Sequence, residues 1–278
     1  MEVQKMAKNL GKALKCILYP GMLYLLAVTP RVVNRPDVGI FRKKYFAHRG
    51  LYDNTGEAPE NSMAAFRRAV EAGYGIELDV QMTKDDIPVI FHDGTMERMC
   101  GVKAKIADYT YEQLQQFKLA DSDQSIPKLA DMLALVDGQV PLIVEIKSET
   151  RDISFCEVID RMLRAYSGEY CIESFNPLVL LWYRRYHNNV VRGQLASNFR
   201  LDGGHKSPLY FFMTHLLLNL FTAPDFIAYN HQFTEEPGRR ICRWLYRHPA
   251  VAWTIRSAEE LEKMNGKFDV FIFEGFLP

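Results

Sequence analysis

Short apolar runs alternate with segments of helical periodicity along the chain from Tyr45 onward. The apolar runs predict β-strands, and they occupy residues 45–50, 75–81, 88–93, 141–147, 170–175, 190–196, 226–230, 251–255 and 269–274. Helices are predicted between most of them, at Ser62–Ala72, Tyr111–Phe117, Leu129–Val136, Phe155–Tyr166, Pro177–His187, Glu235–His248 and Ala258–Asn265. Such alternation is typical of a parallel sheet covered by helices, and a region of about 240 residues suits a (β/α)8 TIM barrel.

The third predicted strand does not fit a regular barrel, because only a short segment around Thr83–Asp86 separates it from the second. A parallel crossover needs about a dozen residues. We therefore expect the second and third strands to form a protruding hairpin that turns near Asp85, or the third strand to pair irregularly. A hairpin brings Glu77 and Asp79 on its first arm close to His92 at the end of its second arm.

Residues 1–40 follow a different pattern. Apolar residues repeat at helical spacing ahead of an apolar run over 16–28, and lysines occupy positions 5, 8, 12 and 15. This pattern is typical of an amphipathic helix at a membrane interface. The apolar run contains Pro20-Gly21 and is shorter than the ~20 residues of a clean span. A true span, a signal peptide and a soluble packing helix are the alternatives. We expect a membrane-associating segment over 1–40, ending in a basic, polar linker, and a barrel domain over 41–278.

A second apolar segment lies between the predicted strands at 190–196 and 226–230. From Leu209 to Phe221 it is apolar on nearly every side of a helix, where an ordinary barrel helix is amphipathic. A helix of this kind must be buried in protein or in lipid. It is either covered by neighbouring helices or an oligomer partner, or it forms one membrane-contacting surface with 6–28 beside the mouth of the barrel.

Two strands carry charged side chains on alternate positions. Glu77 and Asp79 point to the same side of one strand, and Glu145 and Lys147 to the same side of another. An isolated pair of this kind is more often a solvated strand face, but the strands of a parallel barrel have no solvated face. Catalytic groups of such barrels lie at the carboxyl ends of the strands. We therefore expect these side chains to meet in one site.

Three converging carboxylates, Glu77, Asp79 and Glu145, repel one another unless some are protonated or a cation neutralises them. Oxygen ligands favour a hard divalent cation such as Mg²⁺, Ca²⁺ or Mn²⁺ over zinc. Lys147, next to the third carboxylate, is interpreted as a ligand for an anionic substrate oxygen rather than a simple counter-ion.

Two histidines and an arginine complete the predicted site. His48 and His92 each end a predicted strand, and histidine can accept and donate a proton near neutral pH. Arg49 suits bidentate recognition of a phosphate, or an ion pair with a nearby acid. Phe175 and Trp253, near the ends of late strands, contact either a substrate or only the core. Together these groups predict phosphate-ester chemistry.

Composition restricts the function further. The 34 basic and 34 acidic residues cancel, which argues against nucleic acid as a partner. The five cysteines are scattered, show no zinc-binding spacing and favour a reducing compartment, so we expect the catalytic domain to be cytoplasmic. The sequence contains no nucleotide-binding loop, dinucleotide fingerprint, nucleophile elbow or zinc-protease motif.

The segment "AHRG…PENSMAAFRRAVEAGYGIELDVQMTKDDIPVIFHD" resembles the opening motif of the glycerophosphodiester phosphodiesterase family, and the resemblance continues through "PLIVEIK", "IESFNP" and "VAWTI". It implies a (β/α)8 barrel that cleaves glycerophosphodiesters with Mg²⁺ or Ca²⁺, and in some members lysophospholipids. The implied metal ligands are Glu77, Asp79 and Glu145. The implied acid/base and phosphate-facing residues are His48, His92, Arg49 and Lys147.

Two positions depart from the family pattern. Arg256 replaces the usual Asn, and Phe273-Glu274 replace the usual Thr-Asp. We expect both departures to affect the shape of the substrate pocket rather than the core chemistry. The competing hypotheses are a phospholipase or sphingomyelinase-type lyase that yields a cyclic phosphate, and a membrane-tethered binding protein that has lost activity.

Overall fold

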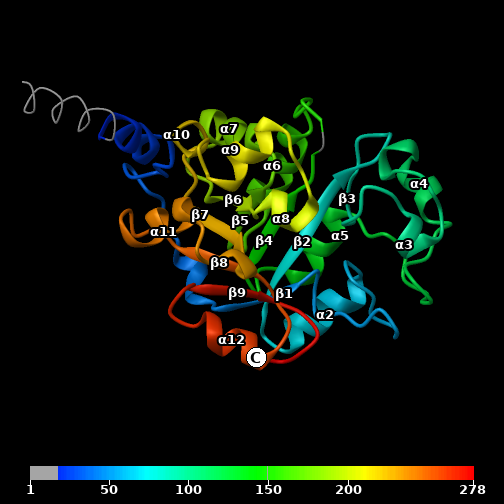
Figure 1. Ribbon diagram of the computed structural model, residues 1–278. Helices are drawn as coiled ribbons and strands as arrows, with labels where there is room; N and C mark the ends of the chain where they lie inside the picture. The colour runs from blue at the N-terminus through cyan, green and yellow to red at the C-terminus, as the bar shows by residue number, and fades with distance from the viewer. Residues whose placement is uncertain (1–17, 149) are drawn as a thin grey trace, which may run out of the picture.

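Eight parallel strands close into a barrel, which confirms the (β/α)8 fold expected from the sequence (Figure 1). The computed structural model describes residues 18–148 and 150–278. The strands follow one another around the barrel in chain order, and β1 pairs with both β2 and β9 to close it. They are β1 (Tyr45–His48), β2 (Gly75–Met82), β4 (Leu142–Ile146), β5 (Tyr170–Ser174), β6 (Arg192–Ala196), β7 (Phe226–Asn230), β8 (Ala250–Ile255) and β9 (Val270–Phe273).

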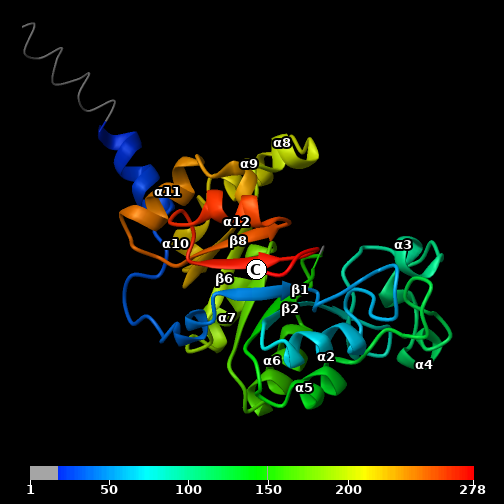
Figure 2. The same cartoon turned by 90° about the horizontal axis from the view of Figure 1, so that it is seen from below.

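The remaining strand, β3 (Pro88–Ile90), pairs antiparallel with the end of β2, which confirms the predicted hairpin. Val80 lies opposite Ile90, and the backbone N–H of Thr83 donates to the carbonyl of Ile87 at 3.1 Å. The hairpin leads into an excursion from the barrel that contains α3 (Glu97–Cys100), η2 (Ile106–Asp108) and α4 (Tyr111–Leu114). This excursion has a small apolar core of its own and projects to one side of the barrel (Figure 2).

The outer helices form where helical periodicity predicted them. They are α2 (Met63–Glu71), α5 (Leu129–Val136), α6 (Cys156–Ala165), α7 (Pro177–Tyr186), α11 (Pro237–Trp244) and α12 (Ala258–Met264). Their apolar faces and the outward faces of the strands make up the main hydrophobic core. At the start of α2 the hydroxyl of Ser62 accepts the backbone N–H of Ala65 at 3.1 Å. Ser62 is therefore the N-cap, which leaves the Asn61 side chain for another role.

The end of the segment predicted to be a polar linker packs against the barrel. Within it, η1 (Gly39–Arg42) places Ile40, which is 5% exposed, in a second apolar cluster with the inward residues of the strands. The ring of Phe41 packs edge-on against Phe226 at 4.9 Å. The amino-terminal end of a barrel is an open apolar surface, and Ile40 and Phe41 close it, whereas residues 32–37 ahead of them are largely exposed.

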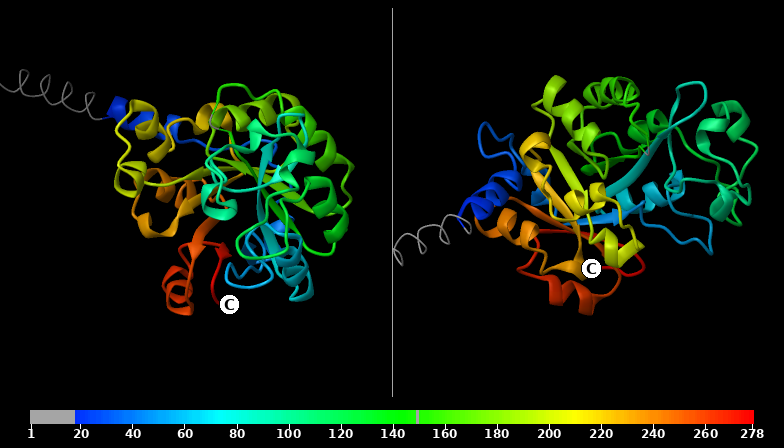
Figure 3. Two further views of the ribbon diagram at one scale, coloured as in Figure 1. Left: turned by 90° about the vertical axis from the view of Figure 1, so that its right-hand side faces the viewer. Right: turned by 45° about the horizontal axis from the view of Figure 1, so that its top comes forward.

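The apolar insertion also differs from its prediction, because it is neither one helix nor buried on all sides. It follows α8 (Phe199–Gly203) and forms α9 (Pro208–Thr214) and α10 (Asn219–Thr222). The two helices are separated at Leu216, whose φ is 57°. Figure 3 shows the ribbon from two further directions, with this segment in yellow to orange. Met213, Leu216 and other residues of one face are buried, and the opposite face is exposed.

The N-terminal helix is described only for residues 18–27, next to α10 and α11 (Figure 1). The predicted interfacial helix over 6–18 lies almost wholly outside the described residues. In the part of the chain that the structure describes, every helix is too short or too polar to cross a membrane. Within the same part, the Asn219 side chain donates to the carbonyl of Val28 at 3.1 Å, which attaches this helix to the barrel.

Candidate active site

Three carboxylates meet at the carboxyl ends of neighbouring strands. Glu77 and Asp79 lie on β2, and Glu145 lies on β4, where it pairs in register with Asp79. One oxygen from each lies within 4.8 Å of the others, and all three side chains are buried. The arrangement follows from the strand period of two, which places Glu77 and Asp79 on the inner face of the barrel. This group could hold a metal ion.

Burial and mutual repulsion oppose full ionisation of this group. The pKa of Glu77 is raised well above its usual value by burial and by the charges of Asp79 and Glu145. Burial also raises the pKa of Glu145, against the opposing effect of Lys147. The pKa of Asp79 is lowered, because Lys147 and its other cationic neighbours outweigh the effect of burial. Ionisation of all three carboxylates therefore requires positive charge in addition to that of Lys147 and Arg49, which a bound cation would supply.

Lys147 and Arg49 are both ion-paired with these acids. The Lys147 Nζ lies 2.8 Å from Glu145 Oε1 and 3.0 Å from Asp79 Oδ1. The Arg49 Nη1 donates to Glu60 Oε1 at 2.6 Å, and its Nε lies 3.5 Å from Asp79 Oδ2. Lys147 is therefore a counter-ion for Glu145 and Asp79 in this structure, although its sequence position predicted a substrate ligand. The substrate-binding roles of both cations stay predictions.

The loop after β1 brings its backbone against the carboxylates. Arg49 and Gly50 have φ values of 55° and 83°, and the backbone N–H of Arg49 donates to Glu77 Oε2 at 3.1 Å. A Cβ at Gly50 would lie 2.9 Å from the backbone of Ala65, so only glycine allows the loop to approach α2 this closely. Asn61, which does not cap the helix, donates from Nδ2 to Asp79 Oδ2 at 2.8 Å.

His48 is held by a carboxylate from the last strand of the barrel. Its Nδ1 lies 2.5 Å from Oε2 of Glu274, which follows β9. Its Nε2 lies 3.9 Å from Glu77 Oε2, so the second ring nitrogen faces the acidic group. Burial and the charge of Arg49 lower the pKa of His48, whereas Glu274 raises it. The ring is therefore oriented with Nδ1 on Glu274 and Nε2 available on the side of the carboxylates.

Glu274 has two further partners. Tyr52 Oη donates to Oε2 at 3.0 Å, and Arg256 Nε donates to Oε1 at 2.7 Å. Burial acts to raise the pKa of Glu274, but its contacts with His48 and Arg256 prevail and lower it to about 2. The two departures from the family pattern thus lie together: Arg256 is bonded to Glu274, and Glu274 contacts His48. The expectation that they affect only the substrate pocket is too narrow.

His92 is held in the same way by its neighbour in the sequence. Its Nδ1 lies 2.7 Å from Asp93 Oδ1. The His92 ring lines a cavity of about 790 Å³ that also exposes Glu145, Lys147 and Phe175. Both histidines therefore have Nδ1 bound to a carboxylate and lie beside the three-carboxylate group. Such a bond fixes the tautomer and leaves Nε2 for proton exchange.

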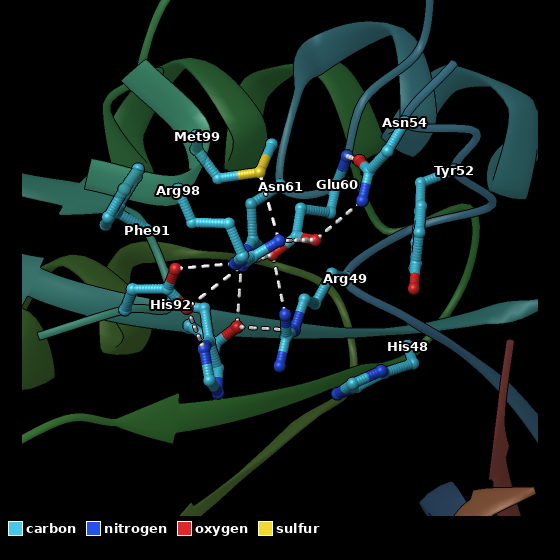
Figure 4. Close-up of polar contacts among 12 residues, drawn as sticks. His48, Arg49, Tyr52, Asn54, Glu60, Asn61, Phe91, His92, Arg98 and Met99 are labelled. Atoms are coloured by element: carbon cyan, nitrogen blue, oxygen red, sulfur yellow. Dashed lines mark hydrogen bonds and ion pairs between the residues drawn. The ribbon is translucent and has the colours of Figure 1, made fainter. Parts of the chain in front are cut away.

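Arg98, on α3, connects the two halves of this network (Figure 4). Its guanidinium donates to both oxygens of Asp93 at 2.7 and 2.9 Å, and to both oxygens of Glu60 at 2.6 and 2.8 Å. Burial acts to raise the pKa of Glu60, but the bonds from Arg98 and the charge of Arg49 lower it to about 2. Arg98 thus links the acid that holds His92 to the acid that holds Arg49.

Phe175 and Trp253 contact each other, with ring centroids 5.7 Å apart and the rings edge-on. Phe175 lines the same cavity as His92 and Lys147. Trp253 contributes to the apolar cluster inside the barrel. The structure therefore places Phe175 at a possible substrate surface and gives Trp253 a packing role behind it.

Several polar residues of the site were not singled out from the sequence. They are Glu60, Asp93, Arg98 and the fourth inward carboxyl group, Glu173 on β5, which pairs in register with Glu145. Among the described residues Glu173 Oε2 has no hydrogen-bond partner, and burial and Glu145 raise the pKa of this side chain. Asp93 directly follows a histidine at a strand end, and this position is a signal that could have identified it. Arg98 lies on an excursion whose path the sequence does not predict.

Comparisons with known proteins agree with this geometry. The model of the glycerophosphoryl diester phosphodiesterase family matches residues 48–239. Human glycerophosphodiester phosphodiesterase 1 is 29% identical over 158 residues, which cover 52% of this chain and 46% of the human protein. A glycerophosphodiester phosphodiesterase from Bacillus altitudinis is 39% identical over 111 residues, 37% of this chain and 44% of that protein. These matches span less than half the length of either relative.

Solved structures share the fold. A phosphodiesterase from Oleispira antarctica, in complex with the product sn-glycerol-3-phosphate, superimposes with a TM-score of 0.67 at 21% identity, over 83% of this chain and 92% of that chain. A glycerophosphodiester phosphodiesterase from Thermotoga maritima has a TM-score of 0.62 at 24% identity, over 82% and 93%. The family model covers most of the barrel, including His48, the three carboxylates and His92, and the chain therefore belongs to the glycerophosphoryl diester phosphodiesterase family.

Proposed function

We propose that this protein hydrolyses glycerophosphodiesters to glycerol 3-phosphate and an alcohol, and that the reaction depends on one divalent cation. The observation that carries the proposal is the arrangement at one end of the barrel. Two histidines, each with Nδ1 on a carboxylate, lie beside a buried three-carboxylate group. Family membership supports the same reaction class.

The residues present fit a hard divalent cation. Glu77, Asp79 and Glu145 offer only oxygen ligands, with one atom of each within 4.8 Å of the others, which suits Mg²⁺ or Ca²⁺. The pKa values of Glu77 and Glu145 are raised because burial and the neighbouring acids disfavour their ionised forms, and such an ion would stabilise those forms. When bound, the cation supplies Lewis-acid polarisation of a phosphoryl oxygen.

The chain's own residues supply proton transfer and charge neutralisation. His48, whose Nε2 faces Glu77, and His92, which lines the cavity, are placed to act as a general base and a general acid on the two sides of a phosphodiester. Each carboxylate on Nδ1 stabilises the protonated ring. Lys147 and Arg49 neutralise the acids and add positive charge near the phosphate.

We further propose that the protein acts at a membrane surface, with its catalytic domain in the cytoplasm, and that its substrates include lysophospholipids. The basis is the apolar and lysine-containing N-terminal sequence together with the exposed apolar side chains of α9. Polar lining residues around His92 suit a phosphate, and Phe175 with Phe155 offers apolar contact in the same cavity.

The test is an assay of the purified full chain on glycerophosphocholine and lysophosphatidylcholine, with and without EDTA, with products identified by phosphorus NMR. We expect release of glycerol 3-phosphate or lysophosphatidic acid, complete loss of turnover in EDTA, and recovery with Mg²⁺ or Ca²⁺. Accumulation of a cyclic phosphate would favour a lyase instead. Absence of turnover with tight substrate binding would favour a binding protein. His187→Ala, at the C-terminal end of α7 and outside the cavity that contains His92, is the matched control for His48→Ala.

A further inference from the structure

Four helical segments that are distant in the sequence form one packed block on the side of the barrel. They are the N-terminal helix (residues 18–27), α9, α10 and α11 (Figures 1 and 2). The hydroxyl of Tyr246, just after α11, donates to the carbonyl of Leu25 at 3.0 Å. A Cβ at Gly238 of α11 would lie 2.5 Å from the carbonyl oxygen of His215, so α11 packs directly on the end of α9.

Large apolar side chains are exposed on three of these helical segments. We refer to them as the apolar flank: Leu18, Met22 and Leu23 on the N-terminal helix, Phe211 and Phe212 on α9, and Trp244 with Leu245 at the end of α11. Met22 is 60% exposed, Phe211 57% and Trp244 66%. Scattered exposed apolar residues are ordinary, but a set gathered on packed neighbouring elements marks a surface that binds something.

We propose that the apolar flank is a docking surface for a lipid bilayer that contains anionic lipids. The chemistry of the flank favours lipid over a protein partner for two reasons. Tryptophan and phenylalanine occur here beside exposed basic side chains, Arg200, Lys206 and Arg247, the combination that stabilises amphipathic surfaces at a membrane interface. In addition, lysines 5, 8, 12 and 15 immediately precede the N-terminal helix in the sequence, and basic residues close to a membrane attract anionic headgroups.

α8 connects α9, which carries part of the flank, with the active-site end of the barrel, since the ring of Phe199 on α8 lies 5.2 Å from that of Tyr210 on α9. α8 begins directly after β6, and the ring of Phe199 packs edge-on against Phe175 at 5.8 Å. Phe175 lines the cavity that contains His92 and Lys147. Between α8 and α9 lies a separate cavity of about 610 Å³, lined by Arg200, Lys206 and Phe211 among others. This basic and aromatic cavity fits a lipid phosphate at the point where the flank meets the mouth of the barrel.

The inference deepens the proposed membrane action but does not depend on the proposed catalysis. Docking by the flank would place the mouth of the barrel next to the headgroup layer, so that a lysophospholipid could reach His92 without leaving the bilayer entirely. Leu216 also lies in the apolar insertion, but it is 1% exposed and belongs to the core. Its substitution would therefore test folding, and the informative positions are Phe211, Phe212, Trp244 and Leu245.

The first measurement is flotation of the full chain with vesicles of phosphatidylcholine alone and of phosphatidylcholine mixed with phosphatidylserine. The variants are Phe211→Ser/Phe212→Ser and Trp244→Ser/Leu245→Ser. The control is Leu277→Ser, which is 69% exposed and lies at the C-terminus, far from the flank (Figure 1). We expect binding to the mixed vesicles, a loss of about tenfold or more in each double variant, and no loss in the control.

The second measurement separates the flank from an anchor formed by residues 1–17 alone. Brominated lipids quench tryptophans that contact the acyl chains, and the difference between the wild type and Trp244→Phe isolates Trp244. We expect quenching of Trp244. Unchanged flotation of both double variants, together with absence of Trp244 quenching, would overturn the proposal. It would also be overturned if the flank variants converted a dimer to a monomer and left vesicle binding unchanged, because the flank would then be a protein interface.

Hydrolysis of soluble glycerophosphocholine by the same variants distinguishes this inference from the proposed function. Vesicle binding through the flank in a protein without turnover would support the docking surface and refute the catalytic proposal. Full turnover without vesicle binding would support the catalytic proposal and refute the docking surface.

Discussion

Substitution of Glu274 tests whether the carboxylate behind His48 contributes to the reaction. Glu274→Gln retains the size of the side chain and removes the charge that accepts the His48 Nδ1–H at 2.5 Å. Hydrogen bonds to charged groups contribute about 1.5–3 kcal/mol and neutral ones about 0.5–1.5 kcal/mol. The lost difference of about 1–2 kcal/mol in the transition state corresponds to a decrease in kcat of about 5–30-fold.

Glu274→Ala removes the orientation of the ring as well as the charge, so we expect a larger decrease in kcat of about 10²–10³, within the range for loss of a general base. Because Glu274 raises the pKa of His48, its removal should also shift the limb of the pH–rate profile that belongs to His48 to lower pH. KM should change little, since Glu274 contacts His48, Tyr52 and Arg256 rather than the cavity that contains His92.

The assay is steady-state hydrolysis of glycerophosphocholine at saturating cation, with thermal unfolding measured in parallel. Arg256→Ala is the matched control, because Arg256 bonds to Oε1 of Glu274 rather than to the Oε2 that contacts His48. The Arg256 side chain is 57% exposed. Such an exposed ion pair contributes only about 0–1 kcal/mol, so its kcat should fall by no more than about fivefold. Normal kcat in Glu274→Ala, or a change confined to KM, would refute the role of Glu274 in orienting His48.

Four further outcomes are expected. Glu77→Gln should abolish most cation binding by isothermal titration calorimetry, and retention of wild-type affinity would remove the carboxylates from the metal site. His48→Ala and His92→Ala should each lower kcat by about 10²–10⁴ without loss of melting temperature; a variant with near-normal turnover would show that histidine to be structural. Arg98→Ala should lower kcat by about tenfold and the free energy of unfolding by about 1 kcal/mol, because its bonds to Glu60 and Asp93 are half-exposed, and Arg98→Lys should restore little of either. Glu274 has a pKa lowered from 4.5 to about 2, so it stabilises the fold above pH 4.5 and this contribution is lost as the pH falls toward 2. The melting temperature of the wild type should therefore fall more steeply over that interval than that of Glu274→Gln.

The sequence by itself determined the barrel, its hairpin and the three-carboxylate group. Each depends on a short-range rule. Apolar runs alternate with helical periodicity, a connection of only a few residues excludes a parallel crossover, and residues two apart on a strand share a face. In a closed parallel barrel every strand ends at the same edge, so Glu77, Asp79 and Glu145 meet without any knowledge of exact packing.

Only the tertiary structure decided which charged groups pair. His48 and Glu274 are 226 residues apart, and Arg98 and Glu60 are 38 residues apart. Any of many acids in the chain could have paired with His48 or with Arg98, and the choice depends on closure of β9 onto β1 and on the path of the excursion after β3. Burial of Ile40 and the break in the apolar insertion at Leu216 have the same origin, because the shape of the surface against which a segment packs is absent from its local pattern.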